Sequence, residues 1–352
     1  MNYTARLKRL RELLSVTACD ALLIENPIDL LYLTGLHLSA GHLVVGLQDS
    51  CLIVDGRYYE KSCQQSLYPV ELLEKSKLKD WLQHTHLTCL GFDQEKTSYQ
   101  RYVTLNTFIH EKKIKEVIPL TPLVQQLRLI KDQQEIDLLR KAAKLGYAGY
   151  EYIASLLEEG ITESELALKL EFFWKTHGAQ RLAFESIIAF GVNSSMPHYR
   201  AGTYALKLDQ IVLMDIGLVL NDYHSDMTRV VYFGQPSKKL EEIQQVVQDA
   251  KDLALSHCRP GVLIGHLDQI ARDHIQSKGY GDYFTHSLGH GIGLEVHEIP
   301  TIRQTGASST LLLQPGMVIT IEPGIYLPGI GGIRLEDTIV ITETSYENLT
   351  QS

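Results

Sequence analysis

The stretch QIVLMDIGLVLNDYHSDMTRVVYF, residues 210–233, decides the fold because it places acidic residues inside apolar strands. Two apolar runs flank residues 220–222, and this pattern predicts a β-hairpin. Asp215 lies in the first run and Asp226 in the second, so we expect them to face each other across the hairpin. Facing like charges destabilise a sheet, and a buried charge without a partner is costly. The hairpin therefore predicts a neutralising cation.

A second stretch, MVITIEPGIYLPGIGGIRLEDTIVIT, residues 317–342, repeats this arrangement. Glu322 and Glu336 lie at equal distances in sequence from Gly329, so a hairpin here again pairs two carboxylates. Two hairpins that each carry an acidic pair need a common neutralising group. Two divalent cations would balance the four carboxylates, and we therefore predict a metal site where the hairpins meet.

The composition is that of an ordinary soluble globular enzyme. The chain has 352 residues, of which 21% are charged and 44% hydrophobic, and this length allows two domains. A formal charge of −9 without a basic cluster argues against a nucleic-acid partner. No segment has the apolar length of a signal peptide or a membrane span. Five scattered cysteines without a CxxC pair indicate reduced thiols, so we expect a cytoplasmic protein without a membrane partner.

Apolar and helical segments alternate in the N-terminal third of the chain. Strands are predicted at 21–24, 42–47, 51–54 and 89–92, and helices at 1–15, 56–67, 76–84 and 99–110. Pro119 and Pro122 mark the end of this region. We therefore predict an α/β domain over residues 1–121 and a second domain over residues 122–352.

The order long helix, shorter helix, histidine and acidic hairpin occurs twice in the second domain. The helices are predicted at 132–158 and 162–177 in the first half, and at 238–257 and 264–277 in the second. The two histidines are His198 and His297. Equivalent elements lie about 100 residues apart, which predicts two related halves about a pseudo-twofold axis.

A segment rich in histidine and glycine supplies a fifth ligand. His290 lies among Gly289, Gly291 and Gly293, which prevent a regular helix and allow close approach of the backbone to a ligand. Four carboxylates and one imidazole form an oxygen-rich site that suits Mn²⁺ or Co²⁺ better than a thiolate-type zinc site. We expect two divalent ions, Mn²⁺ first, with Co²⁺ or Zn²⁺ as alternatives. Two such ions can hold a bridging hydroxide and polarise a carbonyl oxygen, so the site predicts hydrolysis.

Five motifs make the last 230 or so residues similar to the pita-bread metallopeptidases, family M24. The motifs are DIG at 215–217, SDMTR at 225–229, GHGIGLEVHE at 289–298, EPG at 322–324 and RLED at 334–337. The family includes methionine aminopeptidase, aminopeptidase P, prolidase and the inactive relative creatinase. RLED and NSSMPHY at 193–199 resemble the proline-specific branch. The resemblance implies an α/β N-terminal domain like that of creatinase and prolidase, an α+β pita-bread catalytic domain, and a homodimer.

The resemblance implies a role for each ligand candidate. Asp226 and Glu336 would bridge the two metal ions. Asp215 would bind one ion, and His290 and Glu322 would bind the other. Creatinase-like members lack these ligands, so the complete set in this chain predicts an active metallopeptidase.

Catalytic and substrate-binding roles follow in the same way. His198 and His297 match the catalytic histidines that stabilise the oxyanion, and Glu322 would carry the proton. Arg334 shares a strand face with Glu336, so it would contact substrate or orient a ligand carboxylate. The substrate-binding candidates are His286, Arg334 and Tyr326.

The expected reaction is hydrolysis of the bond before proline in peptides. An Xaa-Pro bond is a tertiary amide with a ring constraint, which general peptidases handle poorly. Some prolidases carry an arginine directly after HEIP, where this chain has Thr301, with Arg303 two positions on. This departure favours an Xaa-Pro aminopeptidase, and an Xaa-Pro dipeptidase is the alternative. A non-catalytic binding protein on the same fold is a minor alternative.

Overall fold

The structure, a computed structural model, describes the chain except residues 74–77, 79–80, 82–86, 112–113 and 352. The chain forms two compact units, unit 1 (Met1–Arg128) and unit 2 (Leu129–Ser352). The predicted boundary lies after residue 121, just before helix α6 (Leu123–Leu129). Most of α6 belongs to unit 1, where Arg128 forms a buried ion pair with Asp29 at 2.9 Å.

Unit 1 is built on a mixed six-stranded sheet. The strand order is β4-β3-β2-β1-β5-β6, and β1, β5 and β6 run parallel. The strands are β1 (Ala21–Ile24), β2 (His42–Gly46), β3 (Ser50–Val54), β4 (Val70–Leu72), β5 (Cys89–Asp93) and β6 (Glu116–Leu120). The described helices besides α6 are α1 (Tyr3–Ser15), α2 (Pro27–Thr34), α3 (Tyr59–Gln65) and α5 (Tyr99–His110).

Most of the predicted elements of unit 1 are confirmed. All four predicted strands are present, as are the helices expected near 1–15, 56–67 and 99–110. Helix α2 was not predicted, although Asn26 caps its first turn and Pro27 occupies its first position. Strands β4 and β6 were not predicted either. The helix expected over 76–84 lies largely among residues that the structure does not describe.

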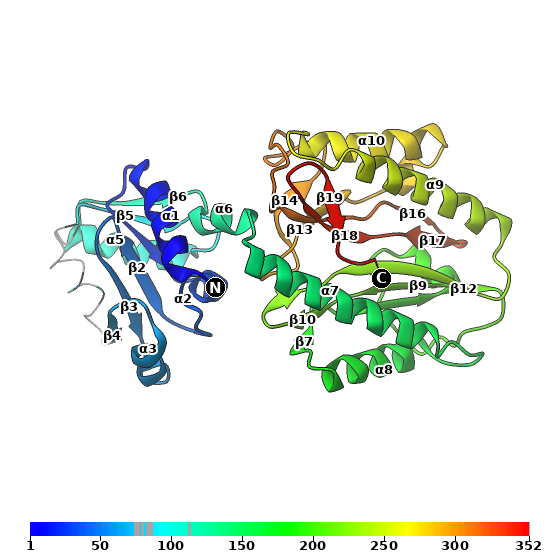
Figure 1. Cartoon of the computed structure of the whole chain (residues 1–352), viewed down its shortest axis with the longest axis horizontal. Helices are drawn as coiled ribbons and strands as arrows, with labels where there is room; N and C mark the ends of the chain where they lie inside the picture. Colours follow the sequence, from blue (N-terminus) through cyan, green and yellow to red (C-terminus); the bar gives the residue numbers. More distant parts are fainter. Residues whose placement is uncertain (74–77, 79–80, 82–86, 112–113, 352) are drawn as a thin grey trace. The chain divides into compact units, whose positions relative to one another are not determined.

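Unit 2 contains the four predicted helices. They are α7 (Gln133–Ala154), α8 (Glu163–Thr176), α9 (Lys238–Ser256) and α10 (Ile264–Ser277). Asp132 and Thr162 form capping boxes with the glutamates three residues on, and the Ser237 side chain caps α9. Figure 1 shows α9 and α10 along one side of the strands of unit 2, and α7 and α8 along the other.

The strands of unit 2 form several small sheets, two of which have the orders β14-β13-β15-β18-β19 and β12-β9-β8. Helices α9 and α10 pack against the first of these, and α7 and α8 against the second. The same order of elements therefore recurs in two halves, and the pseudo-twofold axis stays a prediction. The strands are β7 (Arg181–Leu182), β8 (Ile187–Phe190), β9 (Gln210–Ile216), β10 (Leu218–Leu220), β11 (Tyr223–His224), β12 (Met227–Phe233), β13 (Gly289–Gly291), β14 (Glu298–Ile302), β15 (Val318–Ile321), β16 (Gly324–Leu327), β17 (Gly331–Arg334), β18 (Asp337–Ile341) and β19 (Tyr346–Asn348).

The first acidic hairpin has a different register from the predicted one. Strands β9 and β12 pair Asp215 with Thr228, and the turn consists of Asn221 and Asp222, whose φ values are 49° and 72°. Asp226 is therefore a diagonal neighbour of Asp215, and the expectation that they face each other directly was wrong. The physical reason is the two-residue turn with left-handed backbone, a conformation that Asn and Asp tolerate.

The second acidic hairpin has the predicted register. Strands β15 and β18 pair in the same register as β16 and β17, in which Gly324 lies opposite Arg334. This continuous register places Glu322 opposite Glu336 at the break between the two ladders, as expected. Asp226, Glu322 and Glu336 thus lie where regular strand pairing is interrupted, whereas Asp215 lies within β9, opposite Thr228.

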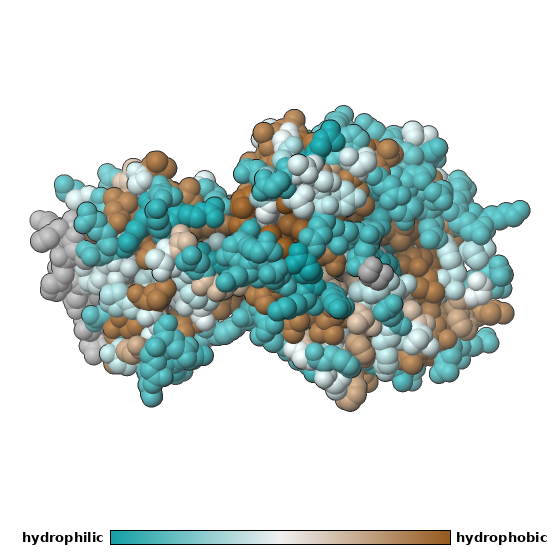
Figure 2. Space-filling model, in the orientation of Figure 1, coloured by the Kyte–Doolittle hydropathy of each residue, from teal (hydrophilic) through white to brown (hydrophobic). Residues whose placement is uncertain are grey.

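The helices α7 and α9 of unit 2 have a polar side toward solvent and an apolar side toward the strands. Figure 2 shows hydrophilic residues over the outer sides of α7 and α9, whose apolar sides face the strands. In the part of the chain that the structure describes, no helix combines the length and the apolar character needed to cross a membrane.

Candidate metal centre

The glycines around His290 let its strand fit between two others. A Cβ atom at Gly289 would lie 2.0 Å from the Thr320 carbonyl oxygen, and one at Gly291 would lie 2.2 Å from the Ile299 carbonyl oxygen. Strand β13 can therefore approach β14 and β15 only with glycine at these positions. The glycines were predicted to allow a close approach of the backbone to a ligand, whereas in the structure they allow a close approach of neighbouring backbone. The result is a fixed position for His290.

Ligand atoms from separate segments of the chain meet at this point. One ligand atom each from Asp226, His290 and Glu336 lie within 4.8 Å of one another. His290 Nε2 is 3.6 Å from an Asp226 carboxylate oxygen and 3.4 Å from a Glu322 carboxylate oxygen. Burial raises the pKa of Glu336, and the charge of Asp215 raises it further. The structure thus brings Asp226, His290, Glu322 and Glu336 together, and Arg334 and Thr228 link Asp215 to Glu336 by hydrogen bonds.

Two oxygens of this cluster lack a partner. Among the described residues, Asp215 Oδ1 and Glu336 Oε1 are buried and accept no hydrogen bond. Buried carboxylate oxygens are nearly always hydrogen-bonded or bound to a cation. The residues present therefore fit a divalent cation, because carboxylate and imidazole are ligands for such ions and these oxygens have no other partner.

Burial and mutual repulsion raise the pKa of the carboxyl groups. Burial, followed by the charges of neighbouring carboxylates, raises the pKa of Asp226 and of Glu322 well above the usual range. The same causes raise the pKa of Glu336 to about 8. Burial lowers the pKa of His290 to about 4, so its imidazole is neutral and able to bind a metal. Without a cation, the cluster binds protons instead.

Arg334 holds Asp215 in place from one side. The arginine is buried, and its Nη2 donates to Asp215 Oδ2 at 2.5 Å. Its Nη1 donates to the Tyr326 hydroxyl at 2.7 Å, and its Nε donates to Thr228 Oγ1 at 3.2 Å. This contact fixes the orientation of the Asp215 carboxylate, whose other oxygen has no hydrogen-bond partner among the described residues. Arg334 thus contacts a ligand carboxylate, one of the two roles expected from its strand position.

His286 is connected to Arg334 through Tyr326. The Tyr326 hydroxyl lies 2.8 Å from His286 Nε2, and His286 Nδ1 lies 2.8 Å from the Ser287 carbonyl oxygen. The carbonyl requires a proton on Nδ1, so Nε2 accepts from the tyrosine. Burial, followed by the charge of Arg334, lowers the pKa of His286 to about 4. A neutral imidazole therefore lies beside the ligand cluster.

His198 and His297 lie at the exposed rim of this cluster. The ring of His297 packs edge-on against that of His290, with centroids 4.4 Å apart. Burial lowers the pKa of His297, Asp215 opposes this shift, and the charge of His198 adds to it. His198 follows the short helix η1 (Gly191–Ser195) and is exposed. Both imidazoles are accessible to a molecule that reaches the ligands.

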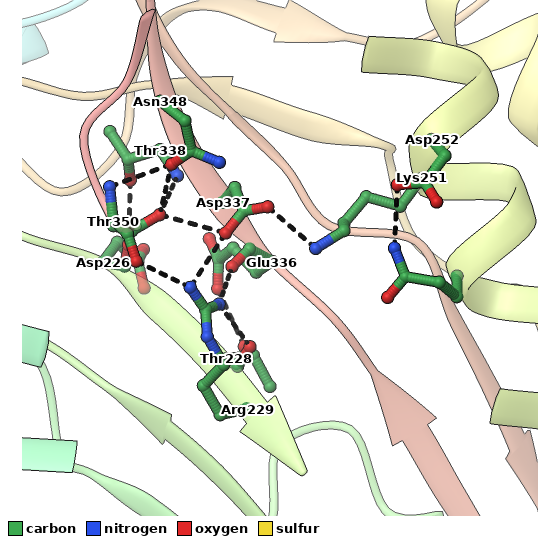
Figure 3. Close-up of polar contacts among 11 residues, drawn as sticks. Asp226, Thr228, Arg229, Lys251, Asp252, Glu336, Asp337, Thr338, Asn348 and Thr350 are labelled. Atoms are coloured by element: carbon green, nitrogen blue, oxygen red, sulfur yellow. Dashed lines mark hydrogen bonds and ion pairs between the residues drawn. The ribbon is translucent and has the colours of Figure 1, made fainter. Parts of the chain in front are cut away.

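A polar network supports the ligands, and its members Thr338 and Arg229 were not predicted from the sequence. Thr228 Oγ1 donates to Glu336 Oε2 at 2.8 Å, and Thr338 Oγ1 donates to the Asp226 carbonyl oxygen at 2.8 Å. Figure 3 shows these residues around Arg229, which contacts the strand of Glu336. The two-residue spacing from Glu336 to Thr338 is a signal that could have identified Thr338.

Comparisons with known proteins agree with this geometry. The family model described as metallopeptidase family M24 matches residues 137–343, and the model of the creatinase/prolidase N-terminal domain matches residues 6–130. An Xaa-Pro dipeptidase of Pyrococcus furiosus is 36% identical over 99% of this chain and 98% of its own. The structure of an Xaa-Pro dipeptidase from Bacillus anthracis is 35% identical, with a TM-score of 0.93 over 100% of this chain and 98% of that one. An X-Pro aminopeptidase from Thermotoga maritima is 32% identical, with a TM-score of 0.87 over 97% of both chains.

Proposed function

We propose, since this chain belongs to metallopeptidase family M24, that it is an Xaa-Pro aminopeptidase that hydrolyses the bond before proline at the N-terminus of peptides. The observation that carries the proposal is the buried cluster of carboxylates with two oxygens that lack partners. Relatives along the whole chain are named for action on Xaa-Pro or X-Pro bonds. These two facts together favour a metal-dependent hydrolase of that bond.

The five ligand candidates would hold two divalent ions, for which Mn²⁺ is the first candidate. Such ions, when bound, would act as Lewis acids on the scissile carbonyl group and make a water molecule more acidic. Asp226 and Glu336 are the candidates for shared ligands because they, with His290, have ligand atoms within 4.8 Å of one another. Metal analysis of the purified protein distinguishes Mn²⁺ from the alternatives Co²⁺ and Zn²⁺.

The chain's own groups would move the proton and bind the oxyanion. Glu322, whose pKa burial and neighbouring carboxylates raise, would take a proton from water and give it to the proline nitrogen as the bond breaks. The nitrogen leaves as a neutral amine only if it gains a proton, because an amide anion is a poor leaving group. His198 and His297, at the exposed rim, would donate hydrogen bonds to the oxygen on which negative charge develops.

His286 and Tyr326 would form part of the pocket for the proline ring. Both side chains are ring systems beside the ligand cluster, and their centroids lie 5.6 Å apart. The hydrogen bond between them fixes both rings, and Arg334 fixes Tyr326 in turn. A rigid pocket wall of this kind suits a ring substrate that has little freedom of its own.

The strand opposite His290 supports a preference for peptides longer than a dipeptide. Thr301 pairs with His290 in the β13–β14 ladder, so their side chains lie on the same face. Thr301 carries no charge for a substrate carboxylate. Two arginines close to the ligand cluster already have carboxylate partners: Arg334 is bound to Asp215, and Arg272 is bound to Asp268. Neither is available to recognise the free carboxylate of an Xaa-Pro dipeptide.

An Xaa-Pro dipeptidase is the second candidate, because two of the relatives reported above carry that name. Cleavage of Ala-Pro, Ala-Pro-amide and Ala-Pro-Ala by the metal-loaded protein separates the two functions. An aminopeptidase cleaves the tripeptide and the amide, since it needs no carboxylate on proline. A carboxylate-dependent dipeptidase cleaves Ala-Pro alone. The matched control is the Asp226→Asn variant, in which every one of these activities is expected to disappear.

A further inference from the structure

Thr350 is fully buried although it belongs to a short segment that follows the last ligand strand. We call residues 346–350, which comprise strand β19 and the two residues after it, the 346–350 segment. The Thr350 hydroxyl accepts a hydrogen bond from the Thr338 backbone N–H at 3.2 Å and lies 3.1 Å from Asp337 Oδ1. It also lies 3.0 Å from Asn348 Oδ1. A buried hydroxyl with this many partners fixes the backbone around it.

The contact with Thr338 leads directly to Asp226. Leu349 N–H donates to the Thr338 carbonyl oxygen at 2.9 Å, so the 346–350 segment binds Thr338 through both of its backbone groups. The Thr338 side chain in turn donates to the Asp226 carbonyl oxygen at 2.8 Å. Thr338 is 2% exposed, so water does not compete for these bonds. The position of the Asp226 backbone therefore depends on the 346–350 segment.

A second set of contacts leads to Glu336. Arg229 donates to the Thr350 carbonyl oxygen at 2.8 Å, to Asp337 Oδ1 at 2.9 Å, and to the Glu336 carbonyl oxygen. Lys251 of α9 donates to the other oxygen of Asp337 at 2.8 Å. Figure 3 shows the contacts of Arg229 and Lys251 with Asp337, next to Glu336. The backbones of Asp226 and Glu336 are thus both hydrogen-bonded to residues that contact Thr350.

We infer that Thr350 is a positioning residue for the metal site: its hydroxyl and carbonyl groups fix the backbone at Asp226 and Glu336 in the spacing that two divalent ions require. This inference rests on the proposed function and extends it. Thr350 contacts neither predicted bridging carboxylate, and it acts through Thr338, Asp337 and Arg229. Groups of this kind set the orientation of metal ligands, and their loss typically weakens metal binding without unfolding the protein.

The test measures Co²⁺ binding by the metal-stripped protein, without reference to turnover. Thr350→Val keeps the shape of the side chain and removes the hydroxyl, whereas Thr350→Ser keeps the hydroxyl. Thr344→Val, an exposed threonine in the turn before β19, is the matched control. Affinity is measured by competition with a chromophoric chelator, and the visible spectrum of bound Co²⁺ reports ligand geometry. We expect about 10- to 100-fold weaker binding and an altered spectrum for Thr350→Val, and values within about twofold of wild type for the other two.

Each outcome decides the question. Wild-type Co²⁺ affinity in a folded Thr350→Val variant overturns the inference and leaves the proposed function intact. Failure of the wild-type protein to bind Co²⁺ overturns the proposed metal site, and the inference with it. If circular dichroism shows that Thr350→Val does not fold, Thr338→Val takes its place, because it removes only the hydroxyl that donates to Asp226. Wild-type affinity in that variant overturns the inference as well.

Discussion

Lowering the pH from 8 to 6 should weaken metal binding by this chain at least about 50-fold. Glu336, whose pKa in the metal-free protein is raised to about 8, must lose its proton before it can bind a cation. At pH 8 about half of the Glu336 side chains are already ionised, whereas at pH 6 only about one in a hundred is. The ratio of these fractions gives the 50-fold difference.

The other ligands fix the direction of the effect. Burial and neighbouring carboxylates also raise the pKa of Asp226 and of Glu322, so their protons must leave too and the loss of affinity increases. His290 contributes nothing, because burial lowers its pKa to about 4 and it is neutral at both pH values. Proton competition at the site therefore weakens binding at low pH and never strengthens it.

Isothermal titration calorimetry with Mn²⁺ measures this effect directly. Titrations at both pH values in two buffers of different ionisation enthalpy give the affinity and the number of protons released. We expect proton release at both values, with more protons released at pH 6. A Mn²⁺ affinity that is equal at the two pH values, without proton release, would contradict the assignment of buried carboxyl groups as the ligands.

Three substitutions test separate parts of the account. Arg334→Met removes the buried cation bound to Asp215. Urea denaturation of the metal-free protein should therefore show a loss of about 3–5 kcal/mol in unfolding free energy. An unchanged unfolding free energy would argue against the Arg334–Asp215 pair. Glu163→Gln weakens a buried acceptor of four hydrogen bonds from the segment that carries His198. The unfolding free energy should fall by about 1–3 kcal/mol in the same assay. The variant should also show a lower kcat without a change in Mn²⁺ affinity. A loss of Mn²⁺ affinity in this variant would show that its effect extends beyond that segment. Thr301→Arg adds a cation on the strand face that carries His290, where it can bind the free carboxylate of Ala-Pro. The ratio of kcat/KM for Ala-Pro to kcat/KM for Ala-Pro-amide should therefore rise about tenfold. An unchanged ratio would mean that position 301 does not face the substrate.

The local pattern of the chain predicted the strands that carry the ligands better than their pairing. The register of Glu322 and Glu336 follows from the symmetry of their hairpin, and it was predicted correctly. The register of Asp215 and Asp226 depends on a two-residue turn with positive φ at both positions, which apolar alternation does not reveal. A shift of two residues keeps both side chains on the same face, so the cluster forms in spite of the error.

Contacts between distant segments could not be predicted from local patterns. Glu163 begins α8, yet it accepts hydrogen bonds from Phe190, Asn193 and Tyr199, which lie about 30 residues further along the chain. Thr350 contacts Thr338 across the turn before β19. Neither residue belongs to a periodic pattern or a metal-ligand motif. Their partners become visible only when the tertiary packing is known.

The most direct test of the central claim is a single experiment on one preparation. The protein is stripped of metal with a chelator, Mn²⁺ is titrated back, and cleavage of Ala-Pro-Ala is followed together with the amount of metal bound. We expect no cleavage by the stripped protein and full recovery as two ions bind per chain. Cleavage that persists after metal removal, or two bound ions with no cleavage of any Xaa-Pro substrate, would contradict the central claim.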